Sequence, residues 1–150
     1  MLSLTHTLIS VPIGLYIHNP VLAFIVACAV HFLADMLLHW NIYPRDFKRF
    51  PFGLIALDVL GGLAAAGVML HREVLQPSVL AAILGGNFPD ILQMLWELTP
   101  MTLRERPALA WTKPYFVFHE KIQRETPRIA VGLVSQAVLL FAAAILVGLH

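Results

Sequence analysis

The hydrophobic pattern divides this chain into long apolar runs, separated by short polar stretches that contain proline. A helix needs about 20 mostly apolar residues to cross a bilayer, and runs of this length or slightly shorter recur along the chain. We therefore predict an all-α protein: a multi-pass transmembrane helical bundle of about five membrane helices, forming a single integral membrane domain over residues 1–150. The predicted spans are residues 4–18, 20–40, 52–70, 77–98 and 128–149.

Two further elements follow from the same pattern. The sequence GGNFPD at residues 85–90 combines glycines with a proline and predicts a break in the fourth span. Broken backbone at membrane depth is tolerated only where it is buried or lines a cavity. In the connection 99–127, the sequence YFVFHEKIQRE places Tyr115, Phe118 and Ile122 on one helical face, so we predict a short helix lying in the membrane interface.

Composition supports the membrane interpretation. The chain is 59% hydrophobic and 13% charged, with a mean hydropathy of +0.77, whereas soluble domains are about 25% charged. The single cysteine, Cys28, excludes an internal disulfide and a cysteine zinc cluster. The first apolar run carries His6 and has no basic segment before it, so we expect it to be retained and not cleaved as a signal peptide.

The basic residues predict the orientation. Of the 10 lysines and arginines, only Arg72 falls on the far side of a five-span topology; the others lie in the loops 41–51 and 99–127 or at Arg128. The positive-inside rule then places the N-terminus on the cytoplasmic side of a bacterial or archaeal membrane. Basic loops attract anionic headgroups, so we expect membrane lipids as partners, and not nucleic acid.

The stretch HFLADMLLHW places three ionisable residues, His31, Asp35 and His39, in a predicted span. A spacing of four residues keeps them on one helical face, with adjacent members about 6 Å apart along the axis. That distance lets two side chains reach one metal ion. Because about 12 Å would separate His31 from His39, we expect one His–Asp pair to bind a given ion. The third residue would be a supporting or catalytic group, or a ligand to a second ion; a metal-free proton relay or structural network is the alternative.

Other ionisable residues reach a similar depth. On this topology Asp35, Asp58 and Asp90 lie about 7–10 Å below the cytoplasmic interface, as His6 does along the first helix. Ionisable side chains in a membrane normally face a partner or a wet cavity. Histidines and carboxylates without thiolates suit zinc, manganese or iron, and we take zinc as the first choice among these divalent metals. The predicted metal ligands are His6, His31, Asp35, His39 and Asp90.

Three residues are predicted to take part in catalysis. Asp90 follows Pro89 and is a candidate ligand or general base, although its carboxylate could equally cap a restarting helix. Asp58 could orient a histidine imidazole. His119 lies in the loop on the same side, where a solvated histidine is the simpler interpretation.

These motifs together resemble the YdjM-like family of putative membrane-bound metal-dependent hydrolases. The resemblance rests on His6 in LTHTL, on the HFLADMLLH stretch and on Pro89-Asp90. The H-x-x-x-D spacing also looks like that of zinc-dependent phospholipases C and related nucleases. The chain departs from the family pattern at Leu92, where a second acidic residue is common, and in having the single His119 where two histidines are usual.

The leading hypothesis is a membrane-embedded metal-dependent hydrolase with a His/Asp site near the cytoplasmic leaflet, acting on a phosphate-bearing lipid or another phosphoester. One alternative is a non-catalytic membrane assembly or scaffold protein, whose polar cluster only fixes helix packing. Another is a small metal or proton transporter. A transporter should connect polar residues to both faces, and the far half of the predicted bundle has almost none.

Overall fold

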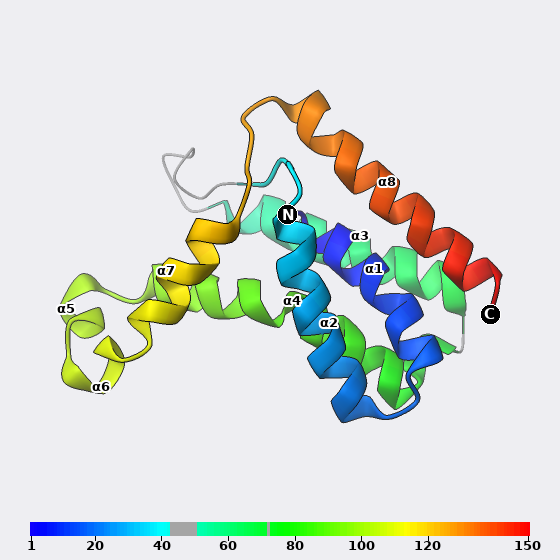
Figure 1. Cartoon of the computed structure of the whole chain (residues 1–150), viewed down its shortest axis with the longest axis horizontal. Helices are drawn as coiled ribbons and strands as arrows, with labels where there is room; N and C mark the ends of the chain where they lie inside the picture. The colour runs from blue at the N-terminus through cyan, green and yellow to red at the C-terminus, as the bar shows by residue number, and fades with distance from the viewer. Residues whose placement is uncertain (43–50, 72) are drawn as a thin grey trace.

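The computed structural model describes residues 1–42, 51–71 and 73–150, which form helices joined by short connections (Figure 1). Within these ranges no strand forms; His39 and Glu125 make only an isolated parallel bridge. The all-α class is therefore confirmed for the described residues. The helices are α1 (Ser3–Tyr16), α2 (Pro20–Asp35), α3 (Phe52–Leu70), α4 (Pro77–Leu98), α5 (Met101–Arg104), α6 (Pro107–Ala110), α7 (Lys113–Ile122) and α8 (Ile129–Gly148), with the 3-10 turn η2 at Glu73–Leu75.

Three helices of the described chain are long and apolar enough to cross a membrane: α3 with 19 residues, α4 with 22 and α8 with 20. The first two predicted spans are shorter in the structure. Helix α1 has 14 residues and ends at Tyr16, and α2 has 16 and ends at Asp35. After Asp35 the chain leaves the helix because its backbone pairs with residues 124–126.

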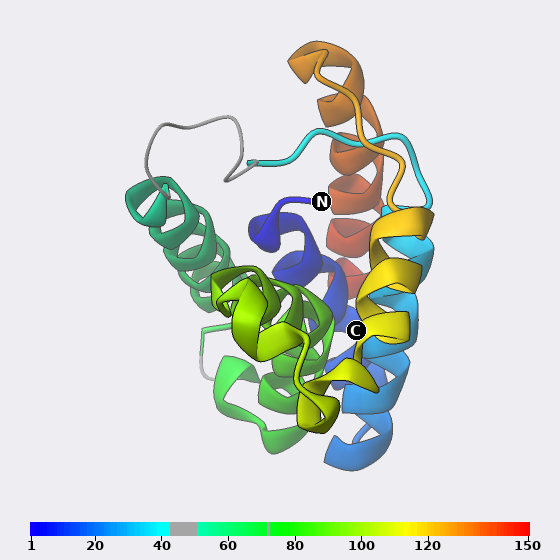
Figure 2. The ribbon, with the colours of Figure 1, turned by 90° about the vertical axis from the view of Figure 1, so that its left-hand side faces the viewer.

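Helix α1 lies at the centre of the bundle, enclosed by α2, α3, α4 and α8 (Figure 2). Its apolar side chains Leu8, Val11 and Leu15 are buried against Val79 and Ile83 of α4. A helix that is buried on all sides places its polar residues in the interior as well. This position is what brings His6 into the middle of the molecule.

The predicted break at residues 85–90 is wrong, because α4 runs without interruption through Pro89. A proline inside a helix removes the hydrogen bond to the carbonyl four residues earlier. That carbonyl belongs to Gly85, and the Cys28 thiol of α2 donates to it at 3.1 Å. The loss is thus compensated by a neighbouring helix, and Gly85 and Gly86 serve close packing instead of a break.

The predicted helix within residues 115–125 is present as α7, which with α5 and α6 projects from one end of the bundle (Figure 1). Phe32 of α2 contacts Tyr115 and Phe118, with ring centroids 6.4 Å and 5.9 Å apart. On the other side, Phe116 stacks on Trp96 of α4, with centroids 4.4 Å apart. Helix α7 is therefore held between the ends of α2 and α4.

The basic residues used for orientation are only partly described. Arg45, Lys48, Arg49 and Arg72 lie outside the described residues. The remaining basic residues belong to the α5–α7 region and to the connection leading to α8: Arg104, Arg106, Lys113, Lys121, Arg124 and Arg128.

Candidate metal centre

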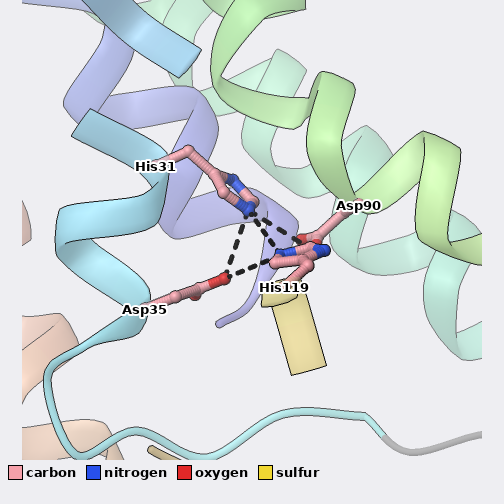
Figure 3. Close-up of side chains that lie close together, drawn as sticks. All are labelled: His31, Asp35, Asp90 and His119. Atoms are coloured by element: carbon pink, nitrogen blue, oxygen red, sulfur yellow. Dashed lines mark hydrogen bonds and ion pairs between the residues drawn. The ribbon is translucent and has the colours of Figure 1, made fainter. Parts of the chain in front are cut away.

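Four ionisable side chains from three helices point toward one another between α2, α4 and α7 (Figure 3). They are His31 and Asp35 of α2, Asp90 of α4 and His119 of α7, and one ligand atom from each lies within 4.8 Å of all the others. The Nε2 atom of His31 is 3.2 Å from Asp35 Oδ2 and 3.7 Å from Asp90 Oδ1. The side chains of His31, Asp35 and His119 are fully buried, whereas that of Asp90 is 28% exposed. The group therefore has one partly open side, at Asp90.

Two further histidines approach the same carboxylates. His6 Nε2 of α1 lies 3.2 Å from Asp35 Oδ1 and 3.8 Å from Asp90 Oδ2. His39 Nε2 lies 3.8 Å from Asp35 Oδ1. The structure thus brings together all five predicted metal ligands, and adds His119 to them.

Hydrogen bonds fix how two of the imidazoles present their nitrogens. His31 Nδ1 donates to the Gly86 carbonyl at 2.7 Å, and His39 Nδ1 donates to the Leu37 carbonyl at 2.8 Å. In a neutral ring the Nε2 atom is then an acceptor, and here it faces carboxylate oxygens. Burial lowers the pKa of His39, which favours the neutral ring. A histidine lone pair and a carboxylate oxygen that face each other repel unless a proton or a cation lies between them.

The remaining contacts of the centre also fit a cation. The Nε2 atoms of His31 and His119 are 3.2 Å apart. The Gln123 amide nitrogen lies 3.2 Å from His119 Nε2. An amide nitrogen can only donate a hydrogen bond, so this contact requires a lone pair on His119 Nε2. Both buried ring nitrogens of His6 and the Nδ1 of His119 have no hydrogen-bond partner. A buried set of imidazole nitrogens and carboxylate oxygens with fixed tautomers is the donor set that zinc and similar ions prefer.

His39 reaches the centre by a different route from the one predicted. The sequence interpretation placed it on the same helix as His31, and this is wrong because α2 ends at Asp35. Instead, His39 N donates to the Arg124 carbonyl and Thr126 N donates to the His39 carbonyl, each at 2.9 Å. This short pairing turns His39 back toward Asp35, so the expected separation of two helical turns from His31 does not arise.

Two polar groups at the centre, and a third that holds the start of α1, were not predicted from the sequence. Gln123 lies 3.4 Å from Asp35 Oδ2, and its position four residues after His119 on one helical face was an available signal. The Met1 amino group lies 2.9 Å from Asp35 Oδ1, a contact that no sequence pattern indicates. Gln136 of α8 is buried and ties the start of α1 to Trp40 by bonding Thr5 and the Trp40 carbonyl. As a polar residue in the most apolar span, Gln136 could have been singled out.

Asp58 has a different environment. Its carboxylate accepts hydrogen bonds from the backbone amides of Ser3, at 2.7 Å, and Leu4, at 3.1 Å. These amides belong to the first turn of α1, where helical hydrogen bonds are missing and a carboxylate also favours the helix dipole. Asp58 therefore caps α1 from the neighbouring helix α3, and its predicted orienting role in catalysis stays a prediction.

Replacing Asp58 with alanine is expected to destabilise the fold without changing the metal content. Two partly buried amides lose their acceptor, which should lower the free energy of unfolding by about 1–3 kcal/mol. Denaturation in detergent micelles and elemental analysis of the folded variant measure the two effects. Asp58→Asn keeps one acceptor oxygen and should recover part of the stability. Loss of bound metal at full stability would instead assign Asp58 to the centre.

A cleft of about 690 Å³ opens beside the centre, between the C-terminal half of α4 and helices α5–α7. Gln123 lines this cleft and also contacts Asp35. On α4, Gln93 and Glu97 line the cleft and follow Asp90 at spacings of three and seven residues, hence on one helical face. Burial raises the pKa of Glu125, another lining residue, to about 7. The cleft therefore lies next to the centre and meets it at Gln123.

No protein-family model matches this chain, and searches of curated proteins and of solved structures find no match either. What the centre can do is therefore inferred from its own geometry.

Proposed function

We propose that this protein is a membrane-embedded metal-dependent hydrolase whose His/Asp centre holds a divalent ion, zinc first, with manganese or iron as alternatives. One observation carries the proposal. Buried imidazoles from α1, α2, α7 and the segment after α2 direct Nε2 atoms at the carboxylates of Asp35 and Asp90. Networks that only fix helix packing have no need for so many acceptors facing one another. The sequence resemblance to YdjM-like hydrolases supports the same interpretation.

The membrane topology we propose has about five crossing helices, with α1 and α2 as the short members. Their 14 and 16 residues correspond to about 21 Å and 24 Å, less than a hydrocarbon core of about 30 Å. Helix α1 is enclosed by other helices along most of its length, which shields most of its residues from lipid. Helices α5–α7 would lie in the interface on the cytoplasmic side, together with the N-terminus, in a bacterial or archaeal inner membrane. The basic residues of that region support this orientation.

The chemistry follows from the exposure of the site. A bound divalent ion would lower the pKa of water and polarise a phosphoryl or acyl group. Asp90 is the partly exposed carboxylate, and it shares a face of α4 with the cleft residues Gln93 and Glu97, so it is the residue that can act as a ligand or as a general base toward a bound substrate. Gln123, which caps the C-terminus of α7, lines the cleft and contacts both Asp35 and His119, so Gln123 and His119 would position the reacting group.

A phosphate-bearing lipid is the substrate we propose. The cleft combines Lys113 with the aromatic residues Trp96 and Phe116, which offer a charge for a phosphate and apolar surface. It is also lined by four glutamates, Glu97, Glu105, Glu120 and Glu125, whose charge favours a phosphate accompanied by a divalent cation. Arg104 also lines it, but its guanidinium donates to the carbonyls of Glu97 and Thr99 and lies over Trp96. Lys113 is thus the better candidate for contact with an anionic headgroup.

Metal analysis tests this function. The full chain, purified in detergent without added chelator, is expected to carry bound metal and to hydrolyse an anionic phospholipid in mixed micelles. Treatment with a chelator should abolish release of the product, and added zinc should restore it. His18→Ala removes an exposed histidine at the opposite end of α1 and should leave metal and activity unchanged. Metal-free wild-type protein would favour the scaffold alternative, in which protonated histidines pair with the carboxylates.

A further inference from the structure

We infer that this centre binds two divalent ions, bridged by the carboxylates of Asp35 and Asp90. The inference rests on the proposed metal-dependent function and goes beyond it, because the group formed by His31, Asp35, Asp90 and His119 accounts for one ion only. It assigns His6 and His39 to a second, separate ion.

The two oxygens of Asp35 face different sets of groups. Oδ1 lies 3.2 Å from His6 Nε2 and 3.8 Å from His39 Nε2, and it forms an ion pair at 2.9 Å with the Met1 ammonium, which a second ion would displace. Oδ2 lies 3.2 Å from His31 Nε2 and 3.5 Å from His119 Nε2. The histidines are thus divided between the two oxygens, as they are around a carboxylate that bridges two metal ions.

Asp90 repeats the same division from the other helix. Its Oδ2 atom lies 3.8 Å from His6 Nε2, whereas its Oδ1 atom lies 3.7 Å from His31 Nε2 and 3.8 Å from His119 Nε2. Both carboxylates therefore place His6 on one side and the pair His31 and His119 on the other. Two carboxylates on separate helices, α2 and α4, thus divide the histidines into the same two sets.

One ion could not use all of these atoms. Ligand nitrogens and oxygens lie about 2.0–2.2 Å from zinc, so two ligands of the same ion are at most about 4.4 Å apart. His6 and His39 do not belong to the group of ligand atoms that lie within 4.8 Å of one another. They are nevertheless fully buried, and the Nε2 atoms of both have no hydrogen-bond partner.

A second ion would satisfy these atoms. His39 donates its Nδ1 proton to the Leu37 carbonyl, which leaves the Nε2 lone pair toward Asp35. The ring of His6 stacks on that of His31 with centroids 3.9 Å apart. The two stacked rings can therefore each bind a different one of two neighbouring ions. Paired ions about 3.5–4 Å apart are typical of enzymes that cleave phosphoesters, in agreement with the proposed substrate class.

The number of ions per chain tests the inference. Elemental analysis of the wild-type protein after dialysis against zinc is expected to give two ions per chain. His39→Gln and His6→Gln should each retain one ion, because the group around His31 and His119 stays complete. His18→Gln, away from the centre, should retain two. Circular dichroism establishes that each variant is folded.

Loading with manganese provides a second readout that does not depend on activity. Two bridged manganese ions couple magnetically, so the wild-type protein should show a broadened, coupled electron paramagnetic resonance spectrum, and His39→Gln the six-line spectrum of an isolated ion. A wild type with one ion and an isolated-ion spectrum would overturn the second site and leave the proposed function standing. A wild type that binds no metal would overturn both.

Discussion

Replacing Asp35 with asparagine is expected to reduce metal affinity by about 100-fold or more, the largest effect of any single substitution in the centre. Among the described residues, Asp35 lies within 3.8 Å of His6, His31, His39 and His119. Asparagine keeps the size of the side chain but removes its charge and one acceptor oxygen. Both ions would then lose one of their two bridging carboxylates, the fully buried one, so elemental analysis after dialysis should find the variant nearly free of metal.

Asp90→Asn is the matched comparison for this prediction. Asp90 is 28% exposed and its oxygens lie 3.7–3.8 Å from the histidines, so water can replace it in part. We expect a smaller loss of affinity, about 10-fold, together with a loss of hydrolysis if Asp90 is the general base. Equal metal binding by wild type and Asp35→Asn, both folded, would show that the ligands lie elsewhere.

Substituting alanine for Gly85 is expected to cause a large loss of stability. A Cβ atom at this position would lie 2.4 Å from the Phe24 carbonyl oxygen and 2.9 Å from Phe24 Cα, both of which are backbone atoms of α2. Backbone cannot rotate away as a side chain can, so α2 and α4 would have to separate. We expect a loss of about 1–3 kcal/mol in the free energy of unfolding, measured by denaturation in micelles.

The same substitution should also weaken metal binding, because His31 and Asp35 lie on α2 and Asp90 lies on α4. Gly67→Ala serves as the control, since nothing lies within 4 Å of the Cβ it would add to α3. There alanine should be neutral or stabilising by up to about 1 kcal/mol, through its higher helix propensity. If the two alanine variants were equally stable, the close approach of α2 and α4 at Gly85 would not contribute to the fold.

Local pattern accounts for much of the fold. Apolar runs predicted the helices, since burial in lipid or protein requires apolar side chains along a whole helix. The four-residue spacing of His31 and Asp35 placed both on one face of α2, as the structure has them. Contacts with other helices decided the structure where the local pattern was ambiguous. Pro89 predicted a helix break, yet α4 continues, because the Cys28 thiol donates a hydrogen bond to the Gly85 carbonyl that the proline leaves without a partner.

The sequence by itself determined an all-helical, membrane-compatible chain and most of the ionisable residues of its centre. Only the tertiary structure decided how these residues meet. It brought His119 and Gln123 over Asp35, turned His39 back through its pairing with residues 124–126, and placed Asp58 at the start of α1. The physical reason is that periodicity reports which face of a helix is buried. Which atoms meet there depends on how helices distant in the chain pack together.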